Sequence, residues 1–463
     1  MKDTRNSPQR PPPPIFRLPA EVLQDIFHRV AEKSSFIRNV RLTCRDWHDL
    51  VAADRALPRH IALRCGYDCK DDHQPDAKYL DYCVHGPKGL NRVLGYIEDA
   101  HFALHLQTHE QMSDKNWSTV PWDKFQLQCV QISIYPISTS YHPTIIDFLH
   151  TLPALHNLNY VHFWGNTSIF SSLMCHSSSH SNKLRTLELN WRPDSESISI
   201  LTSCRHIFSN VKDLKWSLTE GYTSIGFLIA LFGTFEALEA LELDSDLTRP
   251  EDVEVIRRSV DWKFKPRTLT INATLFPAFP SLVLERLVIL SLWLPTERGS
   301  VTGTNHQRIS LPQLASLTLN NSWDGLFEIA APKLKDLHLL GIHVQRDYFT
   351  QTQLLEPSFV ELEGNKDTCE MFLSRVLFPN ITELHLHIQK YWTRQVSALR
   401  PVLSFDDQKH HALKFPQLEH LLVIFHSSLT KHLEELRQGI SSAIGERPRP
   451  ITVRCLLEDE LGV

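Results

Sequence analysis

Five cysteine and histidine residues in a short stretch raise the possibility of a zinc site. They lie within 21 residues of one another: Cys65, Cys69, His73, Cys83 and His85. Thiolates and imidazoles are the ligands that structural zinc prefers, and four of them must surround the ion. The spacing Cys-x3-Cys-x3-His followed by Cys-x-His fits no common zinc pattern, and no Cys-x2-Cys pair accompanies it. We therefore expect these residues to bind no metal.

A second set of histidines has a spacing that would suit a metal only on a helix. The set is His101, His105 and His109, with Glu110 alongside. However, Phe102, Leu104 and Leu106 alternate with polar residues, which favours a strand. The order His-Glu-x-x-His, in which a metalloprotease holds zinc, is missing. A metalloprotease is therefore excluded.

The motifs of common enzymes are also missing. The chain has no Gly-x-Ser-x-Gly nucleophile elbow, no Walker loop and no Gly-x-Gly-x-x-Gly phosphate cradle. Glycine contributes only 16 of 463 residues. We predict a non-catalytic protein without a cofactor. An unfamiliar enzyme domain stays open as an alternative, and a deep pocket lined by converging titratable residues would be its mark.

Composition narrows the class of protein. With 42% hydrophobic residues the chain can build a sizeable core, and nine cysteines are too few for a disulfide scaffold. A net charge of −5 gives no basic surface for nucleic acid or an anionic membrane. The longest apolar run, Ile225 to Phe235, is too short to span a bilayer, and residues 1–14 do not resemble a secretory signal. We expect an intracellular protein of the cytoplasm, the nucleus or both.

Near the N-terminus, residues 15–58 have the pattern of a small helical unit. They follow a charged and proline-rich stretch, residues 1–14, which we expect to be disordered. Pro19 and Glu21 suit the first turn of a helix. Two apolar stripes at helical spacing then follow. A unit of about forty residues cannot bury that many apolar side chains alone, so another part of the chain or a partner must cover them.

Two blocks in this unit resemble the F-box family. They are Leu18-Pro-Ala-Glu-Val-Leu-Gln-Asp-Ile-Phe27 and Val40-Arg-Leu-Thr-Cys-Arg-Asp-Trp47. The segment between them, Ala31 to Asn39, lacks the second Leu-Pro-like turn that is frequent in the family. The alternative is a helical cap on the rest of the chain. The resemblance implies binding to the Skp adaptor, which tethers a cullin, through Leu18, Pro19, Glu21, Val22, Leu23, Ile26, Phe27, Val30, Val40, Leu42, Cys44 and Trp47.

A phrase of the form Leu-x-x-Leu-x-Leu recurs through the remaining chain. Clear copies begin at Leu184, Val211, Leu238, Leu287, Leu314, Leu334, Ile381 and Leu418, and weaker ones at Leu155, Pro266 and Phe359. Successive starts lie 20 to 37 residues apart, mostly within or near the range of leucine-rich repeats. In a short strand the fourth and sixth positions share one face, and stacked neighbours bury it.

These observations predict an α/β fold in which a short helical F-box unit precedes an irregular leucine-rich-repeat-like solenoid of parallel strands plus helices. We place the solenoid at residues 155–463 and expect residues 59–154 to form divergent early repeats or a linker subdomain. An ordinary α/β domain with leucine-rich strands is the alternative. The ninth position of the copies lacks the family's asparagine, so no full asparagine ladder is expected.

Several local features of the solenoid follow from the same pattern. Prolines before many copies are expected to set up the turn into the strand. Segments Ser195–Phe208 and Pro250–Val260 have a helical pattern. Early strands are expected at His60–Cys65, Phe102–Leu106 and Leu127–Ile134, and a last one at Ile451–Leu457.

Charged residues gather at the outward positions of the predicted strands. Seven carboxylates oppose one lysine, Lys215, and they are Glu188, Asp213, Glu242, Asp336, Glu361, Glu363 and Glu383. A row of like charge attracts an oppositely charged partner, so we hypothesise a basic target segment. The alternative is a face whose charges serve only solubility.

The resemblance to the F-box family implies the substrate-recognition subunit of a Skp–cullin–F-box ubiquitin ligase. The chain as a whole is similar to the large F-box families of filamentous fungi. The alternative is an F-box scaffold or trafficking factor that acts with the Skp adaptor alone.

Overall fold

A computed structural model of the chain describes the elements that carry the repeats. Its described residues are 22, 23, 26, 59–65, 82–85, 102–108, 127–134, 158–164, 166–177, 183–191, 193–217, 224–244, 250–293, 307–320, 327–342, 356–364, 380–388, 417–425, 438 and 451–457. They belong to two compact units, Met1–Leu189 and Asn190–Val463. The predicted domain limits at residues 58 and 154 stay predictions.

The first unit contains a parallel sheet and helix α6 (Thr167–Ser177). Its strands are β1 (Arg59–Cys65), β2 (Tyr82–His85), β3 (Phe102–Thr108), β4 (Leu127–Ile134), β5 (Tyr160–Trp164) and β6 (Thr186–Asn190). Their order in the sheet is β2-β1-β3-β4-β5-β6. The strands expected at His60–Cys65, Phe102–Leu106 and Leu127–Ile134 are confirmed, whereas β2 was not predicted.

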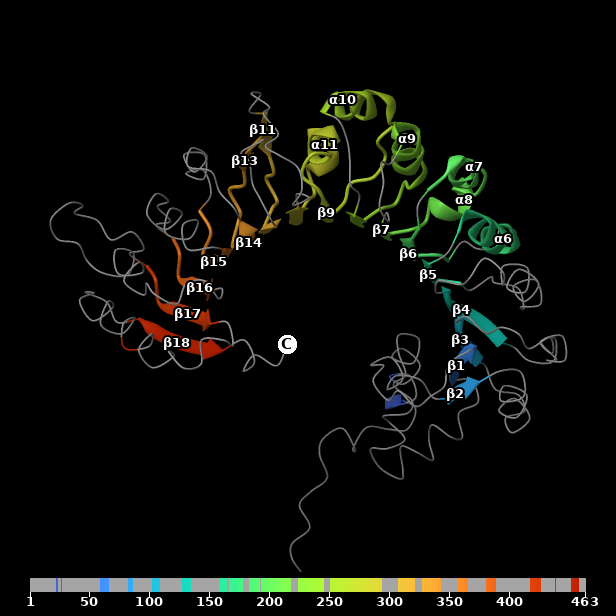
Figure 1. Ribbon diagram of the computed structural model, residues 1–463, viewed down its shortest axis with the longest axis horizontal. Helices are drawn as coiled ribbons and strands as arrows, with labels where there is room; N and C mark the ends of the chain where they lie inside the picture. The colour runs from blue at the N-terminus through green and yellow to red at the C-terminus, as the bar shows by residue number, and fades with distance from the viewer. Residues whose placement is uncertain are drawn as a thin grey trace, which may run out of the picture. The chain divides into compact units, whose positions relative to one another are not determined.

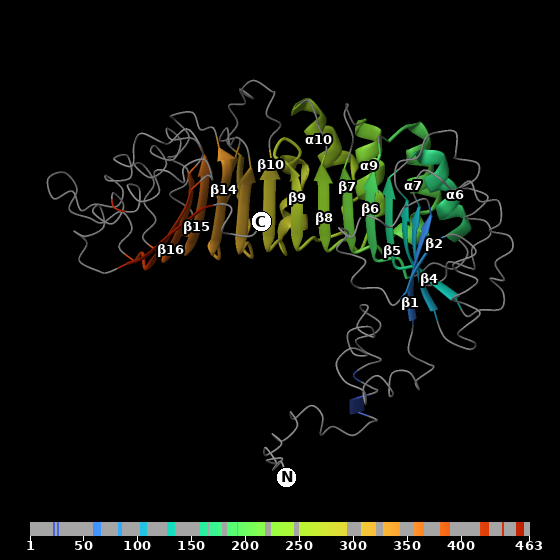
Figure 2. The ribbon, with the colours of Figure 1, turned by 60° about the horizontal axis from the view of Figure 1, so that its bottom comes forward.

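The second unit is a longer parallel sheet whose strands follow one another in chain order (Figure 2). They are β7 (Asp213–Ser217), β8 (Ala240–Asp244), β9 (Thr268–Asn272), β10 (Ile289–Trp293), β12 (Ser316–Asn320), β14 (Asp336–Ile342), β15 (Phe359–Gly364), β16 (Glu383–Ile388), β17 (His420–Phe425) and β18 (Thr452–Leu457). The predicted last strand is confirmed. Parallel strands with helices are consistent with an α/β solenoid-like fold.

Strands of the second unit alternate along their length between buried and accessible side chains, most clearly on β7, β8, β10 and β12. On β7, Leu214 and Trp216 are buried, while Asp213 and Lys215 are exposed. The same alternation recurs on β8, β10 and β12, because the side chains of a strand point to opposite faces in turn. The fourth and sixth positions of the Leu-x-x-Leu-x-Leu phrase therefore form the core, as predicted.

Two of the weaker copies have a different starting point from the predicted one. In β5 the buried side chains are Leu158, Val161 and Phe163, so this copy begins at Leu158 and not at Leu155. Leu158 is an inward residue whether the copy starts at Leu155 or at Leu158. The strand buries Val161 and Phe163, and this selects the later start. In β15 the buried residues are Val360 and Leu362, which moves the start from Phe359 back to position 357. In β15 the start moves by two residues, one full period of a strand, so each side chain stays on its predicted face.

The turns into the strands are tied together by a regular chain of backbone hydrogen bonds. The amide of Glu239 donates to the carbonyl of Lys212, that of Arg267 donates to Glu239, and the series continues to Thr452, with N···O distances of 2.7 to 2.9 Å. Pro312 and Pro332 occupy the second position of turns that end at Leu314 and Leu334. Proline fits that position because its φ is already set. The predicted role of these prolines is confirmed.

Helices of the second unit lie on one face of its sheet (Figure 1). They are α7 (Ser195–Ser203), α8 (Arg205–Phe208), α9 (Ile225–Thr234), α10 (Pro250–Ser259), the 3-10 helix η6 (Phe276–Ala278) and α11 (Ser281–Leu284). The two predicted helical segments are confirmed. The apolar run considered for a membrane span forms α9, with Phe227, Leu228 and Leu231 buried. In the described part of the chain, no helix is long and apolar enough to cross a membrane.

Helix α7 begins at a complete capping box. The Ser197 amide donates to the Asp194 Oδ1 atom at 2.9 Å, and the Asp194 amide donates to the Ser197 Oγ atom at 3.0 Å. Two of the amides that a helix start leaves unpaired are thus satisfied.

We expect Asp194→Ala to lower the free energy of unfolding by about 1 kcal/mol, since the capping carboxylate is lost. The control is Glu196→Ala, which also removes a carboxylate from the first turn but leaves the capping box intact. Urea denaturation followed by circular dichroism measures both. An equal loss in the two variants would show that helix-dipole charge, and not the cap, is what matters.

In two repeats a short strand takes the place that helices hold elsewhere. Strands β11 (Gln307–Ser310) and β13 (Phe327–Ala330) pair in parallel as a separate sheet. Ile309 and Ile329 are buried, so these strands also cover the core. The sequence pattern did not predict them, because four residues are too few to show a period.

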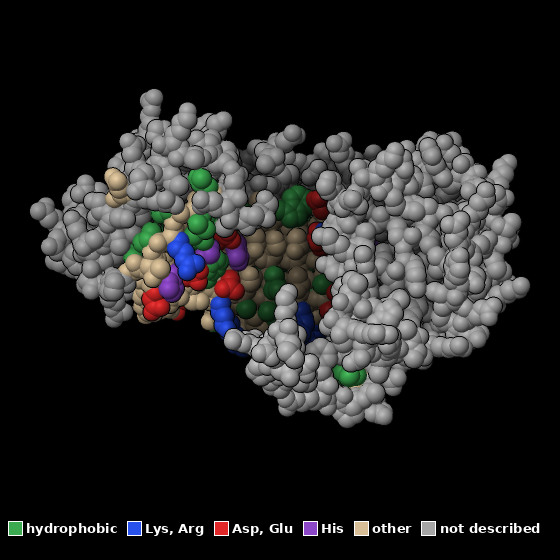
Figure 3. Space-filling view, turned by 90° about the horizontal axis from the view of Figure 1, so that it is seen from below, with side chains coloured by type: hydrophobic (Ala, Val, Ile, Leu, Met, Phe, Trp, Pro, Cys, Tyr) green, Lys and Arg blue, Asp and Glu red, His purple; other side chains and the backbone are tan. Residues whose placement is uncertain are grey.

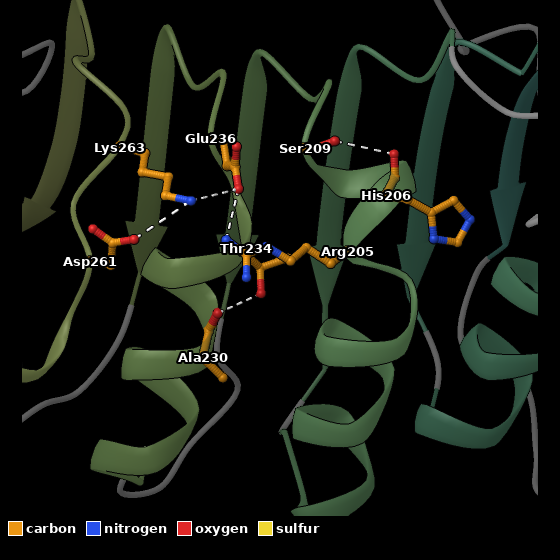
Figure 4. Close-up of polar contacts among 8 residues, drawn as sticks. All are labelled: Arg205, His206, Ser209, Ala230, Thr234, Glu236, Asp261 and Lys263. Carbon is orange, nitrogen blue, oxygen red and sulfur yellow. Dashed lines mark hydrogen bonds and ion pairs between the residues drawn. The ribbon is translucent and has the colours of Figure 1, made fainter.

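Ion pairs link successive repeats beside the helices (Figure 4). Glu236 lies 2.7 Å from Arg205 and 3.3 Å from Lys263, which is itself 3.6 Å from Asp261. The hydrogen bonds from Arg205 and Lys263 hold the pKa of Glu236 below its ordinary value. These side chains are exposed, so water screens the pairs and each contributes little to stability.

Candidate functional site

The predicted adaptor-binding residues lie largely outside the described residues. Three of them are described and helical: Val22, Leu23 and Ile26. Leu23 is buried, whereas Val22 is 43% exposed. A single exposed valine is ordinary on a protein surface and does not by itself indicate a partner. The adaptor contacts of all twelve residues stay predictions, and nine of the twelve lie outside the described residues.

The strand face opposite the helices of the second unit presents its side chains in rows set by the register. We call it the open face. One row crosses the sheet through Asp213, Ala240, Thr268, Ile289, Ser316, Asp336, Phe359, Glu383, His420 and Thr452. The next row passes through Lys215, Glu242, Thr270, Ser291, Thr318, His338, Glu361, His385, Leu422 and Arg454. Because neighbouring strands are about 4.8 Å apart, adjacent members of a row are within reach of one bound side chain.

The middle of the open face carries no charge at its described positions. Strands β9, β10 and β12 present Thr268, Thr270, Ile289, Ser291, Ser316 and Thr318 there. The seven predicted carboxylates therefore do not form one continuous row. Asp213 and Glu242 lie on β7 and β8, while Asp336, Glu361, Glu363 and Glu383 lie on β14 to β16. Glu188 lies on β6 of the first unit.

On β7 and β8 an ion pair partly neutralises the charges of the open face. The Nζ atom of Lys215 is 2.8 Å from Glu242 Oε1, and both side chains are more than 40% exposed. Water competes with such a pair, and its contribution to stability is below about 1 kcal/mol.

On β14 to β16, carboxylates and imidazoles lie on neighbouring strands of the open face, in what we call the histidine–carboxylate patch. It consists of Asp336, His338, Phe359, Glu361, Glu363, Glu383, His385 and His387. The two oxygens of Glu361 are 2.6 Å from His338 Nδ1 and 2.7 Å from His387 Nε2. Figure 3 shows acidic and histidine side chains gathered together beside an area of mostly neutral ones.

Glu361 is the most constrained member of this patch. Its side chain is only 22% exposed and is held from both sides by imidazoles. The hydrogen bonds from His338 and His387 stabilise the carboxylate, and they keep the pKa of Glu361 far below its ordinary value despite partial burial, which raises it. Glu361 is therefore an ionised and fixed group on this face.

Glu383 and Phe359 complete the patch. Glu383 Oε1 is 2.8 Å from His385 Nε2, and the Glu383 side chain is 44% exposed. The Phe359 ring lies between two imidazoles, with centroids 5.3 Å from His338 and 4.7 Å from His385. The patch thus presents oriented carboxylates around an aromatic ring, an arrangement that can bind a cation.

Among the described residues, no three or more His, Cys, Asp or Glu residues are grouped so that they could hold a metal ion. Of the residues first considered for zinc, Cys65, Cys83 and His85 lie on β1 and β2, while Cys69 and His73 lie outside the described residues. His105 lies on strand β3, which confirms the strand expected there.

Sequence reasoning found the carboxylates of the patch but missed Phe359 and His387. The Leu-x-x-Leu-x-Leu phrase places Phe359 at the start of a repeat, where an inward side chain is expected. His387 occupies the seventh position of the copy that begins at Ile381, just beyond the phrase. If the alternation of inward and outward residues is extended to the full length of each strand, Phe359 and His387 both fall on the outward face.

Comparison with known families locates one domain. An F-box-like family model matches residues 15–64, so the chain carries an F-box-like domain at its N-terminal end. F-box domains bind Skp-type adaptors of Skp–cullin–F-box complexes, and this match supports the predicted F-box protein. No curated protein matches the chain.

Proposed function

We propose that the chain is the substrate-recognition subunit of a Skp–cullin–F-box ubiquitin ligase. The observation that carries this proposal is the F-box-like domain at residues 15–64, ahead of a parallel sheet with an open face. The domain suggests an adaptor-binding role at one end of the chain. The open face supports a target-binding role for the second unit, because its side chains are accessible and the core does not use them.

The second unit is, in this proposal, a leucine-rich-repeat-like solenoid. Support comes from the recurring phrase, the parallel strands in chain order and the chain of backbone hydrogen bonds between neighbouring turns. Repeats of this kind contact mainly their neighbours and present wide binding surfaces.

The proposed mechanism involves no bond chemistry by this chain. The adaptor holds one end and, through it, a cullin; the repeats hold a target protein. Tethering both to one scaffold raises the effective concentration of the target's lysines near the ubiquitin-conjugating enzyme. The protein would need no cofactor for this task.

Affinity capture of the full chain from cells tests the proposal, with bound proteins identified for the wild type and for Leu18→Ala/Pro19→Ala. We expect the wild type to capture both the Skp adaptor and a cullin, and the double variant to lose both. A matched control is Lys215→Ala, an exposed change on the open face that is expected to leave adaptor and cullin capture unchanged. Adaptor capture without a cullin would favour the scaffold or trafficking role, and capture of neither by the wild type would overturn the proposal.

A further inference from the structure

Phe359 places an aromatic ring among carboxylates on the open face. Its register partners are Asp336 on β14 and Glu383 on β16, and Glu361 lies two residues further along β15 on the same face. On the opposite face of β15, Val360 and Leu362 are buried in the core. The Phe359 ring therefore adds nothing to the core of this strand. It is half-buried beside the imidazoles of His338 and His385, and part of its surface stays accessible on the open face.

On the strands that flank the ring the charged side chains are carboxylates, and Arg454 lies further along the same face on β18. The open-face positions described on β14 to β16 include four carboxylates, those of Asp336, Glu361, Glu363 and Glu383, and no Lys or Arg. His338 and His387 fix the orientation of Glu361, and His385 fixes that of Glu383. Fixed carboxylates lose little side-chain entropy when a cation binds, and they favour a partner of positive charge.

The combination of a ring and carboxylates favours arginine over other cations. A guanidinium is planar, stacks on an aromatic ring and donates two parallel hydrogen bonds to a carboxylate. The lysine ammonium is a compact, strongly hydrated charge without this fork. An apolar side chain could contact the ring, but it would desolvate the carboxylates beside it without replacing their hydrogen bonds.

We propose that Phe359, Asp336 and Glu383 form an arginine-binding site that recognises a basic segment of the target protein. The guanidinium lies over the Phe359 ring and donates to the flanking carboxylates, while Glu361, held by its two histidines, contributes fixed negative charge. The inference rests on the proposed function, in which the open face binds the target.

Fluorescence anisotropy on the full chain, with labelled hexa-arginine, hexa-lysine and hexa-glutamine peptides, tests the site. We expect hexa-arginine to bind, hexa-lysine to bind several-fold more weakly and hexa-glutamine not to bind. Phe359→Leu is expected to weaken hexa-arginine about fivefold and to reduce the preference for arginine. Phe359→Tyr keeps the ring and is expected to stay within about twofold of the wild type.

The matched pair Glu383→Gln and Glu242→Gln separates a site from general charge, since each removes one carboxylate from the open face. We expect about a threefold loss of hexa-arginine affinity for Glu383→Gln and almost none for Glu242→Gln. Equal losses in these two variants, or an unchanged affinity in Phe359→Leu, would overturn the proposal. If Phe359→Leu fails to fold, Phe359→Tyr and the glutamine pair decide the question.

Adaptor capture distinguishes this proposal from the proposed function. Folded Phe359→Leu is expected to capture the Skp adaptor as well as the wild type does. If the wild type captures no adaptor but binds hexa-arginine through Phe359, the ligase role fails while the arginine site stands. If adaptor and cullin are captured but Phe359 has no effect on the peptides, only the arginine site fails.

Discussion

Trp216→Ala is expected to lower the free energy of unfolding by about 3–5 kcal/mol, the range for removing a large buried aromatic side chain. Trp216 is fully buried on β7. Its ring centroid lies 4.8 Å from that of Trp191 and 4.9 Å from that of Phe227, in an edge-to-face arrangement with the latter. Its Nε1 atom also donates to the Trp191 carbonyl at 3.4 Å. Alanine would leave a cavity that two aromatic rings cannot easily fill.

Guanidinium denaturation followed by far-ultraviolet circular dichroism measures this loss. Trp216→Phe keeps most of the ring contacts and is expected to lose about half as much. Lys215→Ala, on the opposite face of the same strand, is expected to cost less than about 1 kcal/mol, because its ion pair is exposed. A Trp216→Ala loss as small as that of Lys215→Ala would show that the core of β7 does not depend on this side chain.

Glu361→Gln is expected to lower the free energy of unfolding by about 2 kcal/mol at pH 7, because the charge-assisted hydrogen bonds from His338 and His387 are weakened. The matched control is Glu242→Gln, whose exposed pair with Lys215 contributes less than about 1 kcal/mol. Urea denaturation at pH 7 compares both variants with the wild type. Equal losses would mean that the two histidines contribute nothing beyond an ordinary surface pair.

The effect of Glu361 depends on pH in a defined direction. Its pKa is lower in the folded protein than the ordinary value of 4.5, so the folded state binds this proton less readily than the unfolded chain. The stability from the carboxylate is therefore complete above about pH 4.5 and declines as the pH falls below that value. The gap between wild type and Glu361→Gln is expected to narrow by about 1 kcal/mol from pH 5.5 to pH 3.5. A constant gap would contradict the lowered pKa.

Local pattern was enough to predict the strands, but not the contacts across them. The phrase at Leu238 or Leu314 fixes both the strand and its buried face, because a period of two needs only six residues to show itself. It could not fix where the copy near Leu155 begins, because the apolar residues there fit a start at Leu155 as well as one at Leu158. It also missed β2, β11 and β13, which have four residues each and are too short for any period.

The network of the histidine–carboxylate patch was beyond sequence reasoning for a different reason. Glu361 meets His338, 23 residues earlier, and His387, 26 residues later. Repeat lengths vary from copy to copy, so only the register between neighbouring strands brings these side chains together. Without that register the sequence predicts a row of acidic side chains, and in the structure the neutral strands β9, β10 and β12 interrupt this row.

Those uncharged strands have an electrostatic consequence. From β8 to β14 the sheet advances four strand spacings, through β9, β10 and β12, which is about 19 Å at the usual separation. The Debye length at physiological ionic strength is about 8 Å. The two charged ends of the open face are thus insulated from each other by salt, and each can change its charge without altering what the other attracts.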